Sequence, residues 1–164
     1  MLKNFARAIA TGAFVLAAVI PTTASAAGGG GSGTPGVISI AIVPIVTLSD
    51  RLILTGTLTT TCPELDQFPG GPPVTAFFPD GQLNVEEVAG NSIAHAGLGS
   101  WTDVCDGVSR TYTLSGTAWD HPFHPGTGAG SAFAGQVCGY DPVSAMFTCF
   151  FGAATQAVSI VAVH

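Results

Sequence analysis

The sequence predicts an all-β domain, an antiparallel sandwich or barrel that two disulfides hold together. Long segments alternate apolar and polar residues with a period of two, four cysteines follow a secretory leader, and Gly- and Pro-rich turns separate the apolar runs. No segment combines a helical period with helix caps. We therefore expect roughly seven to nine short strands in one domain.

Residues 1–26 form the leader, MLKNFARAIATGAFVLAAVIPTTASA. Lys3 and Arg7 give it a charged start, an apolar run follows, and Ala24-Ser25-Ala26 supplies the small residues of a cleavage site. The apolar run is shorter than the ~20 residues that a membrane-spanning helix needs. The leader therefore predicts a signal peptide and a secreted protein, extracellular or associated with the cell envelope; a retained N-terminal anchor is the alternative.

A Gly-rich segment, residues 27–36, follows the leader. Its composition is typical of a flexible linker, so we expect a tether that leads into a β-domain over residues 37–164. No strand precedes the segment and no Gly-Lys-Ser/Thr sequence follows it, so it does not fit a phosphate-binding loop.

The charge of the chain excludes two classes of partner. Beyond the leader there is no lysine, and Arg51 and Arg110 stand against ten acidic residues. Such a domain lacks the basic surface that binds nucleic acid or anionic lipid. The C-terminal residues 145–164 are apolar, but polar residues and a glycine interrupt them. Two strands fit this segment better than a membrane span does.

Two segments carry the clearest strand pattern. In residues 52–62 the inward face is expected to hold Leu52, Leu54, Gly56, Leu58, Thr60 and Cys62. In residues 110–118 it is expected to hold Tyr112, Leu114, Gly116 and Ala118. The opposite faces are mostly threonine, which favours a strand without adding charge.

Shorter segments complete the expected fold: residues 37–48, 74–78, 82–88, 131–138, 145–151 and 157–163. Pro44 cannot donate to a strand ladder, so the first segment is predicted to be an edge strand or one that changes sheets. Pro79-Asp80-Gly81 predicts a turn. Residues 139–142 predict the connection of a hairpin.

The four cysteines permit three pairings. Cys138 and Cys149 lie at the two ends of a predicted hairpin, where cross-strand Cβ atoms come close enough for a disulfide. The remaining pair is then Cys62–Cys105. A structural zinc site is the alternative, but the cysteines lack the close C-x-x-C spacing of such sites.

The segment His121-Pro122-Phe123-His124-Pro125 is the densest cluster of functional groups. Two imidazoles three residues apart could bind a metal ion, with Asp120 as a third ligand. The alternative is an exposed turn in which Trp119 and Phe123 close the end of the core. No motif fixes the remaining ligands, so the turn is favoured and no cofactor is expected.

Other polar groups give weaker indications. Asp103, Asp106 and Gly107 around Cys105 could hold calcium, although Asp106-Gly107 is better explained as a turn. Glu86 and Glu87 are adjacent, so a strand would point them to opposite faces. No Gly-x-Ser-x-Gly elbow activates a serine, and we expect no enzyme.

The aromatic residues offer a further candidate site. Trp101, Trp119, Phe123 and Phe150 could line a ligand-binding surface, but the core of a sandwich also needs such residues. We favour the core for most of them.

A family resemblance rests on four short motifs in order. They are Thr59-Thr60-Thr61-Cys62, Cys105-Asp106-Gly107 with Tyr112-Thr113-Leu114, Phe133-Ala134-Gly135-Gln136-Val137-Cys138, and Cys149. Together they resemble small secreted actinobacterial proteins of unassigned function, over about residues 46–163. The resemblance implies an immunoglobulin-like β-sandwich and a location outside the cell. The architecture is also similar to that of the enediyne-carrier apoproteins, whose cysteine spacings differ.

These observations predict a secreted, non-catalytic domain used in extracellular binding or surface structure. Its partner would be an extracellular protein, a glycan or a small molecule. The alternatives are a small-ligand carrier with an aromatic cleft and a metal-binding domain built on His121 and His124.

Overall fold

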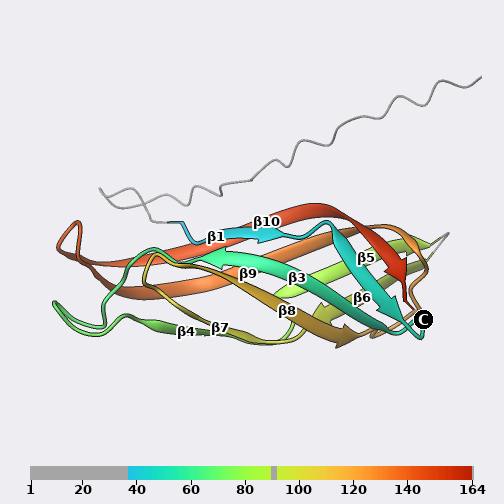
Figure 1. The fold of residues 1–164 in the computed structure, drawn as a ribbon, viewed down its shortest axis with the longest axis horizontal. Helices are drawn as coiled ribbons and strands as arrows, with labels where there is room; N and C mark the ends of the chain where they lie inside the picture. The colour runs from blue at the N-terminus through green and yellow to red at the C-terminus, as the bar shows by residue number, and fades with distance from the viewer. Residues whose placement is uncertain (1–36, 90–91, 164) are drawn as a thin grey trace, which may run out of the picture.

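The computed structural model describes residues 37–89 and 92–163, so the predicted leader and tether lie outside the described residues (Figure 1). The described residues form ten strands and no helix. None of them belongs to a helix that could cross a membrane. The predicted all-β, mostly antiparallel architecture is confirmed.

Most of the strands are joined by short turns, and the two longer connections are residues 62–74 and 118–125. Their bounds are β1 Ser39–Ile42, β2 Ile45–Ser49, β3 Ile53–Thr61, β4 Thr75–Phe78, β5 Leu83–Ala89, β6 Ser92–Leu98, β7 Trp101–Val104, β8 Ser109–Thr117, β9 Gly126–Asp141 and β10 Met146–Ala162.

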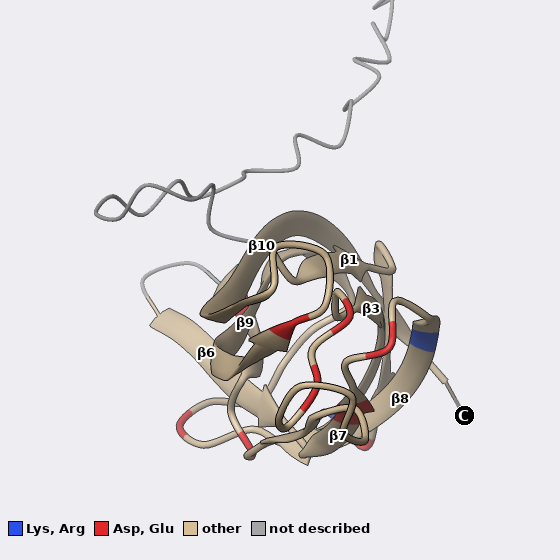
Figure 2. Cartoon of the chain, turned by 90° about the vertical axis from the view of Figure 1, so that its left-hand side faces the viewer, with Lys and Arg blue, Asp and Glu red and all other residues tan. Residues whose placement is uncertain are grey.

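Eight strands form one large sheet that curls back toward itself (Figure 2). β3 lies between β8 on one edge and β1 with β2 on the other; β10, β9, β5 and β6 follow beyond β2. A bridge between Ala96 and Ala118 then brings β6 beside the end of β8. The N–H of Gly99 also donates to the carbonyl of Ser115 at 3.1 Å. The apolar faces of the strands therefore enclose a single core.

A second sheet of two strands, β4 and β7, covers the remaining side of this core. Phe78 of β4 stacks on Trp101 of β7, with ring centroids 4.9 Å apart, and both side chains are buried. Aromatic pairs in this offset arrangement add to the stability that burial alone provides.

The two clearest predicted strands are confirmed, and their inward faces are as predicted except at Leu52, which lies in the turn before β3 and is exposed. In β3, Leu54 and Leu58 are buried, and in β8 Leu114 is buried. The outer faces meet as a ladder of hydroxyl pairs between the two strands: Thr55 with Ser115 at 2.7 Å, Thr57 with Thr113 at 3.3 Å and Thr59 with Thr111 at 2.9 Å. Such cross-strand pairs stabilise a sheet without charge.

The chain breaks its first strand at Val43 and Pro44, but it does not change sheets there. β1 and β2 both pair with β3, and the Pro44 carbonyl accepts the N–H of Ser159 at 2.7 Å. Proline thus occupies the break, where its missing N–H costs no ladder bond.

The C-terminal hairpin is longer than predicted. The segments expected as 145–151 and 157–163 are one continuous strand, β10, and β9 starts well before residue 131. An irregularity where Phe150 and Gly152 pair with β9 lets the two long strands bend around the core. Strands β6 and β7 were not predicted, because Ala and Gly in β6 give it only a weak apolar alternation.

Both predicted disulfides form, and the structure contains Cys62–Cys105 and Cys138–Cys149. Cys138 and Cys149 lie directly opposite each other in the β9–β10 pair. Cys62 and Cys105 are fully buried and join the end of β3 to the end of β7. Paired cysteines of this kind suggest an oxidising location outside the cytoplasm.

Candidate functional site

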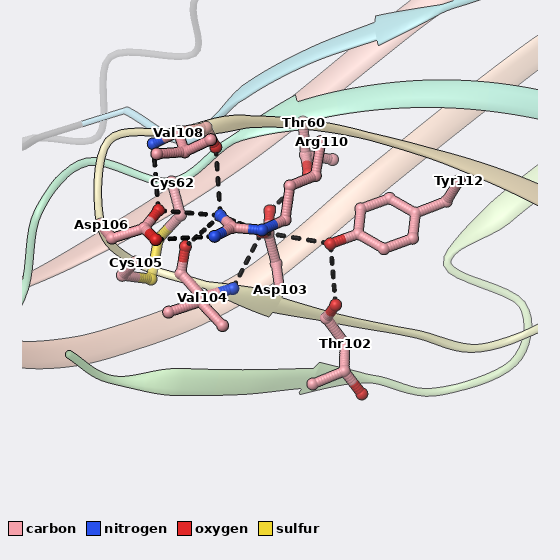
Figure 3. A network of polar contacts seen from close by, with 10 residues as sticks. All are labelled: Thr60, Cys62, Thr102, Asp103, Val104, Cys105, Asp106, Val108, Arg110 and Tyr112. Atoms are coloured by element: carbon pink, nitrogen blue, oxygen red, sulfur yellow. Dashed lines mark hydrogen bonds and ion pairs between the residues drawn. A yellow bond between two sulfur atoms is a disulfide. The ribbon is translucent and has the colours of Figure 1, made fainter. Parts of the chain in front are cut away.

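Asp103 is the centre of a polar network inside the domain (Figure 3). Its side chain has no exposed surface. The Thr60 hydroxyl donates to Oδ2, while Oδ1 accepts from the N–H of Val104 at 2.9 Å and from the Tyr112 hydroxyl at 3.2 Å. A buried carboxylate requires this number of donors, because desolvation without them would be costly.

Arg110 closes the network on its solvent side. Its guanidinium donates to both carboxylate oxygens of Asp106, at 2.8 and 2.6 Å, and to the carbonyl of Val104 at 3.0 Å. A further contact reaches Asp103 at 3.4 Å. The hydrogen bond from Arg110 lowers the pKa of Asp106 to about 2. Burial, followed by the nearby charge of Asp103, raises the pKa of Tyr112 to about 12.

The network holds together β3, β7 and β8 beside the Cys62–Cys105 disulfide. Asp106 turns its carboxylate to Arg110 and to the N–H of Val108, at 3.0 Å, and Gly107 adopts a φ of 75°. These are features of a tight turn, the explanation favoured over calcium. The carboxylates of Asp103 and Asp106 are both engaged by protein donors.

The segment that follows β8 closes the opposite end of the core. Phe123 is fully buried and its N–H donates to the carbonyl of Arg51 at 2.9 Å, as expected for a residue that caps the core. The same expectation was wrong for Trp119, whose side chain is 67% exposed. The loop therefore buries one aromatic ring and presents the other.

Asp120 fixes the start of this loop to strand β6. Its Oδ1 accepts the N–H of His95 at 3.0 Å, and its Oδ2 lies 2.7 Å from Nδ1 of His95. The bond to the imidazole is the main cause that lowers the pKa of Asp120 to about 2. The N–H of His121 also donates to Asp120, at 2.8 Å.

His124 fixes the end of the loop through two other residues. Its N–H donates to Oε2 of the buried Glu87 at 2.7 Å, and its Nδ1 lies 3.8 Å from Oε1 of the same carboxylate. The Arg51 guanidinium lies 2.6 Å from Nε2. Because a guanidinium can only donate, this contact is a hydrogen bond in the tautomer that leaves Nε2 without a proton.

The candidate metal ligands are therefore not brought together. Asp120 binds His95, His124 binds Glu87 and Arg51, and His121 contributes its backbone. Among the described residues no three His, Cys, Asp or Glu side chains are grouped as a metal site. Sequence reasoning missed the roles of His95 and Glu87. For Glu87 a signal was available, because it continues in β5 the alternating series of residues that face the core.

Of the four aromatic candidates, three belong to the core, as favoured, and one does not. Trp101, Phe123 and Phe150 are 3%, 0% and 6% exposed and belong to the core. Trp101 and Phe150 lie at inward-facing positions of β7 and β10. Trp119 alone of the four lies on the surface. It borders an open groove of about 310 Å³. The remaining lining residues are Asp80, Gly81, Gly97, Gly99, Ser115, Gly116 and Thr117.

A second hollow, of about 470 Å³, lies between β4 and β9. Phe77 and Phe133 stand at its border, and both side chains are at least half exposed. β4 pairs with β7 alone, and β5 pairs with β9 only as far as Ala132, so the strand edges beside the hollow are open.

The chain was compared with models of protein families, with curated proteins and with solved structures, and none of these comparisons gives a match. The resemblance to small secreted actinobacterial proteins stays a prediction, and functional inference depends on the geometry of the chain itself.

Proposed function

We propose that this protein is a secreted, non-catalytic binding domain with an immunoglobulin-like sandwich as its frame. The observation that carries the proposal is the exposure of Trp119 beside a groove, while the other candidate aromatics are buried. Ligand sites are typically concave and combine aromatic side chains with a few polar groups.

The ionisable groups support a non-catalytic role. Asp120 and His95 form a carboxylate–imidazole pair, as in a hydrolase triad, but such a triad also needs a hydroxyl nucleophile at the other ring nitrogen. No serine or threonine hydroxyl is hydrogen-bonded to His95 within residues 37–89 and 92–163. Asp120 instead positions the loop that carries Trp119.

A thermal-shift screen of the purified mature protein tests the proposal. A ligand that binds only the folded state raises Tm in a concentration-dependent way, by mass action. The screen contains neutral and charged oligosaccharides, extended peptides and small apolar molecules. Binding without turnover is the expected result. Hydrolysis of any of these compounds that disappears in His95→Ala would contradict the proposal.

A carrier of small apolar ligands is the second candidate, favoured by the larger hollow between β4 and β9. Phe77 and Phe133 would provide the apolar contacts there. Substituting Phe77 by Ser should abolish binding of apolar probes and leave the unfolding transition nearly unchanged, because the side chain is exposed. Unaltered binding in that variant would remove this candidate.

A further inference from the structure

Trp119 is exposed and also fixed in place. The backbone N–H of Trp119 donates to the carbonyl of His95 at 3.0 Å. The carboxylate of the next residue, Asp120, binds both the backbone N–H and the imidazole of His95. Phe123, four residues after Trp119, is buried and anchors the loop in the core. A loop whose backbone is fixed in this way loses little conformational freedom when a ligand binds.

The floor of the groove is bare backbone, because glycines occupy the positions beneath the indole. A Cβ at position 97 would lie 2.6 Å from Cζ2 of Trp119 and 3.0 Å from the Cα of Gly81. A Cβ at position 116 would overlap the carbonyl of Gly97. The indole thus lies against Gly97, and side chains on the floor would displace it.

The rim of the groove is polar and has no positive charge. Asp80 supplies a carboxylate and Thr117 a hydroxyl, while the hydroxyl of Ser115, which also lines the groove, pairs with Thr55. The two arginines of the described residues, Arg51 and Arg110, contact His124 and Asp106 elsewhere. Acceptors and hydroxyls therefore surround one large aromatic face, in a setting that repels anions.

We propose that this groove binds an uncharged sugar ring of an extracellular oligosaccharide, an inference that rests on the proposed binding function. A pyranose has an apolar C–H face that can stack on the Trp119 indole. Its hydroxyls can donate to Asp80 and exchange hydrogen bonds with Thr117. The hollow of about 310 Å³ is at the lower end of the ~300–1,000 Å³ typical of small-molecule sites, as expected for one or two rings.

Tryptophan emission tests the inference directly, because the chain has two tryptophans and Trp101 is buried. The probes are neutral hexasaccharides of glucose, mannose, xylose, galactose and N-acetylglucosamine, a galacturonate hexamer and tetramethylammonium. We expect at least one neutral hexasaccharide to shift the emission, with an affinity that does not depend on salt. No shift with any neutral hexasaccharide would overturn the inference, as would tighter binding of the anionic or cationic probe.

Trp119→Ala should weaken binding of the active hexasaccharide by about 10-fold or more, as for other aromatic anchors, measured by calorimetry. Phe147→Ala removes an equally exposed aromatic ring from β10, outside the groove, and serves as the matched control with unchanged affinity. Equal affinity of both variants and the parent would overturn the inference.

Gly97→Ala tests the geometry while keeping the indole. The added methyl displaces Trp119, so affinity should fall toward that of Trp119→Ala. Gly126→Ala is its control, since a Cβ at position 126 meets no atom within 4 Å. Full affinity of a folded Gly97→Ala variant would count against stacking in this groove.

The outcomes also separate the inference from the proposed function. Binding of a peptide or an apolar molecule that is lost in Phe77→Ser but kept in Trp119→Ala would overturn the sugar inference and leave the binding function standing. No binding of any probe by the parent protein would overturn both.

Discussion

The two ends of strand β8 carry polar side chains at similar density and use them differently. At its start, Arg110 and Tyr112 complete a network around the buried Asp103 (Figure 3). Beyond its end, Asp120 and His124 bind side chains of β6 and β5 and fix a loop that exposes Trp119. One end holds the frame together, and the other displays a surface.

The difference shows that a dense polar cluster is by itself no sign of a ligand site. Around Asp103 the carboxylate oxygens point to protein donors inside the molecule, so nothing is left for a ligand. In the loop the carboxylates also bind protein donors, but the loop that they fix exposes the apolar ring of Trp119 to solvent. What each end leaves exposed indicates its role more clearly than the residue types that it contains.

Substituting Asp103 by Ala should have the largest effect. It leaves the Thr60 hydroxyl and the Val104 N–H without their acceptor, whereas Arg110 keeps its pair with Asp106. Each buried donor left unsatisfied typically costs ~1–3 kcal/mol. Urea unfolding measures the loss in the free energy of unfolding. Ligand binding of the fraction that remains folded should not change. A loss below about 1 kcal/mol, the usual effect of a single substitution, would contradict the structural role of this end.

Removing each disulfide in turn should rank the two crosslinks. The chain-entropy model gives about 4 kcal/mol for Cys62–Cys105, which closes the longer loop, and about 3 kcal/mol for Cys138–Cys149. Double Ser variants and urea unfolding provide the comparison. A larger loss of stability on removing Cys138–Cys149 would contradict the expectation that the crosslink beside Asp103 stabilises the domain more.

Tyr112→Phe should make the protein more resistant to alkali. The folded pKa of Tyr112 is about 12, raised above 10.0 by burial and by Asp103. Unfolding therefore becomes favoured as the unfolded chain ionises, and the contribution of Tyr112 is lost between pH 10 and 12. Stability measured across this range should fall less steeply in the variant than in the parent. Parallel curves would contradict the assignment.

Asp120→Asn should make the conformation of the loop less sensitive to low pH. The folded pKa of Asp120 is about 2, below 3.8, so its contribution is present above pH 3.8 and is lost as the pH falls toward 2. Because Asp120 follows Trp119, emission of the exposed indole reports the release of the loop. In the parent this change should occur between pH 4 and 2, ahead of global unfolding. An emission curve that stays the same in the variant would show that Asp120 does not control the loop.

Much of the frame could be predicted from local pattern. The alternation of Leu54 and Leu58 with threonine determined the faces of β3, and the position of Cys138 and Cys149 at the ends of one hairpin determined both disulfides. These features depend on neighbours in sequence or on a single strand pair.

The candidate site could not be predicted in the same way, because it depends on how distant strands meet. Trp101 begins β7, and Trp119 lies just beyond the end of β8. Only the contact of β6 with the end of β8, through Gly97 and Gly116, places one ring outside the core. The pairing of Asp120 with His95 likewise requires that contact, so the segment 120–124 suggested a metal site that the fold separates.

The central claim is that one tryptophan belongs to the frame and the other to a ligand, and the two indole N–H resonances test it most directly. The chain has two tryptophans, so a nitrogen–proton correlation spectrum contains two such signals. Titration with the active neutral hexasaccharide should shift the Trp119 signal and leave the signal of the buried Trp101 in place. A ligand-dependent shift of Trp101, or of neither signal, would contradict the account.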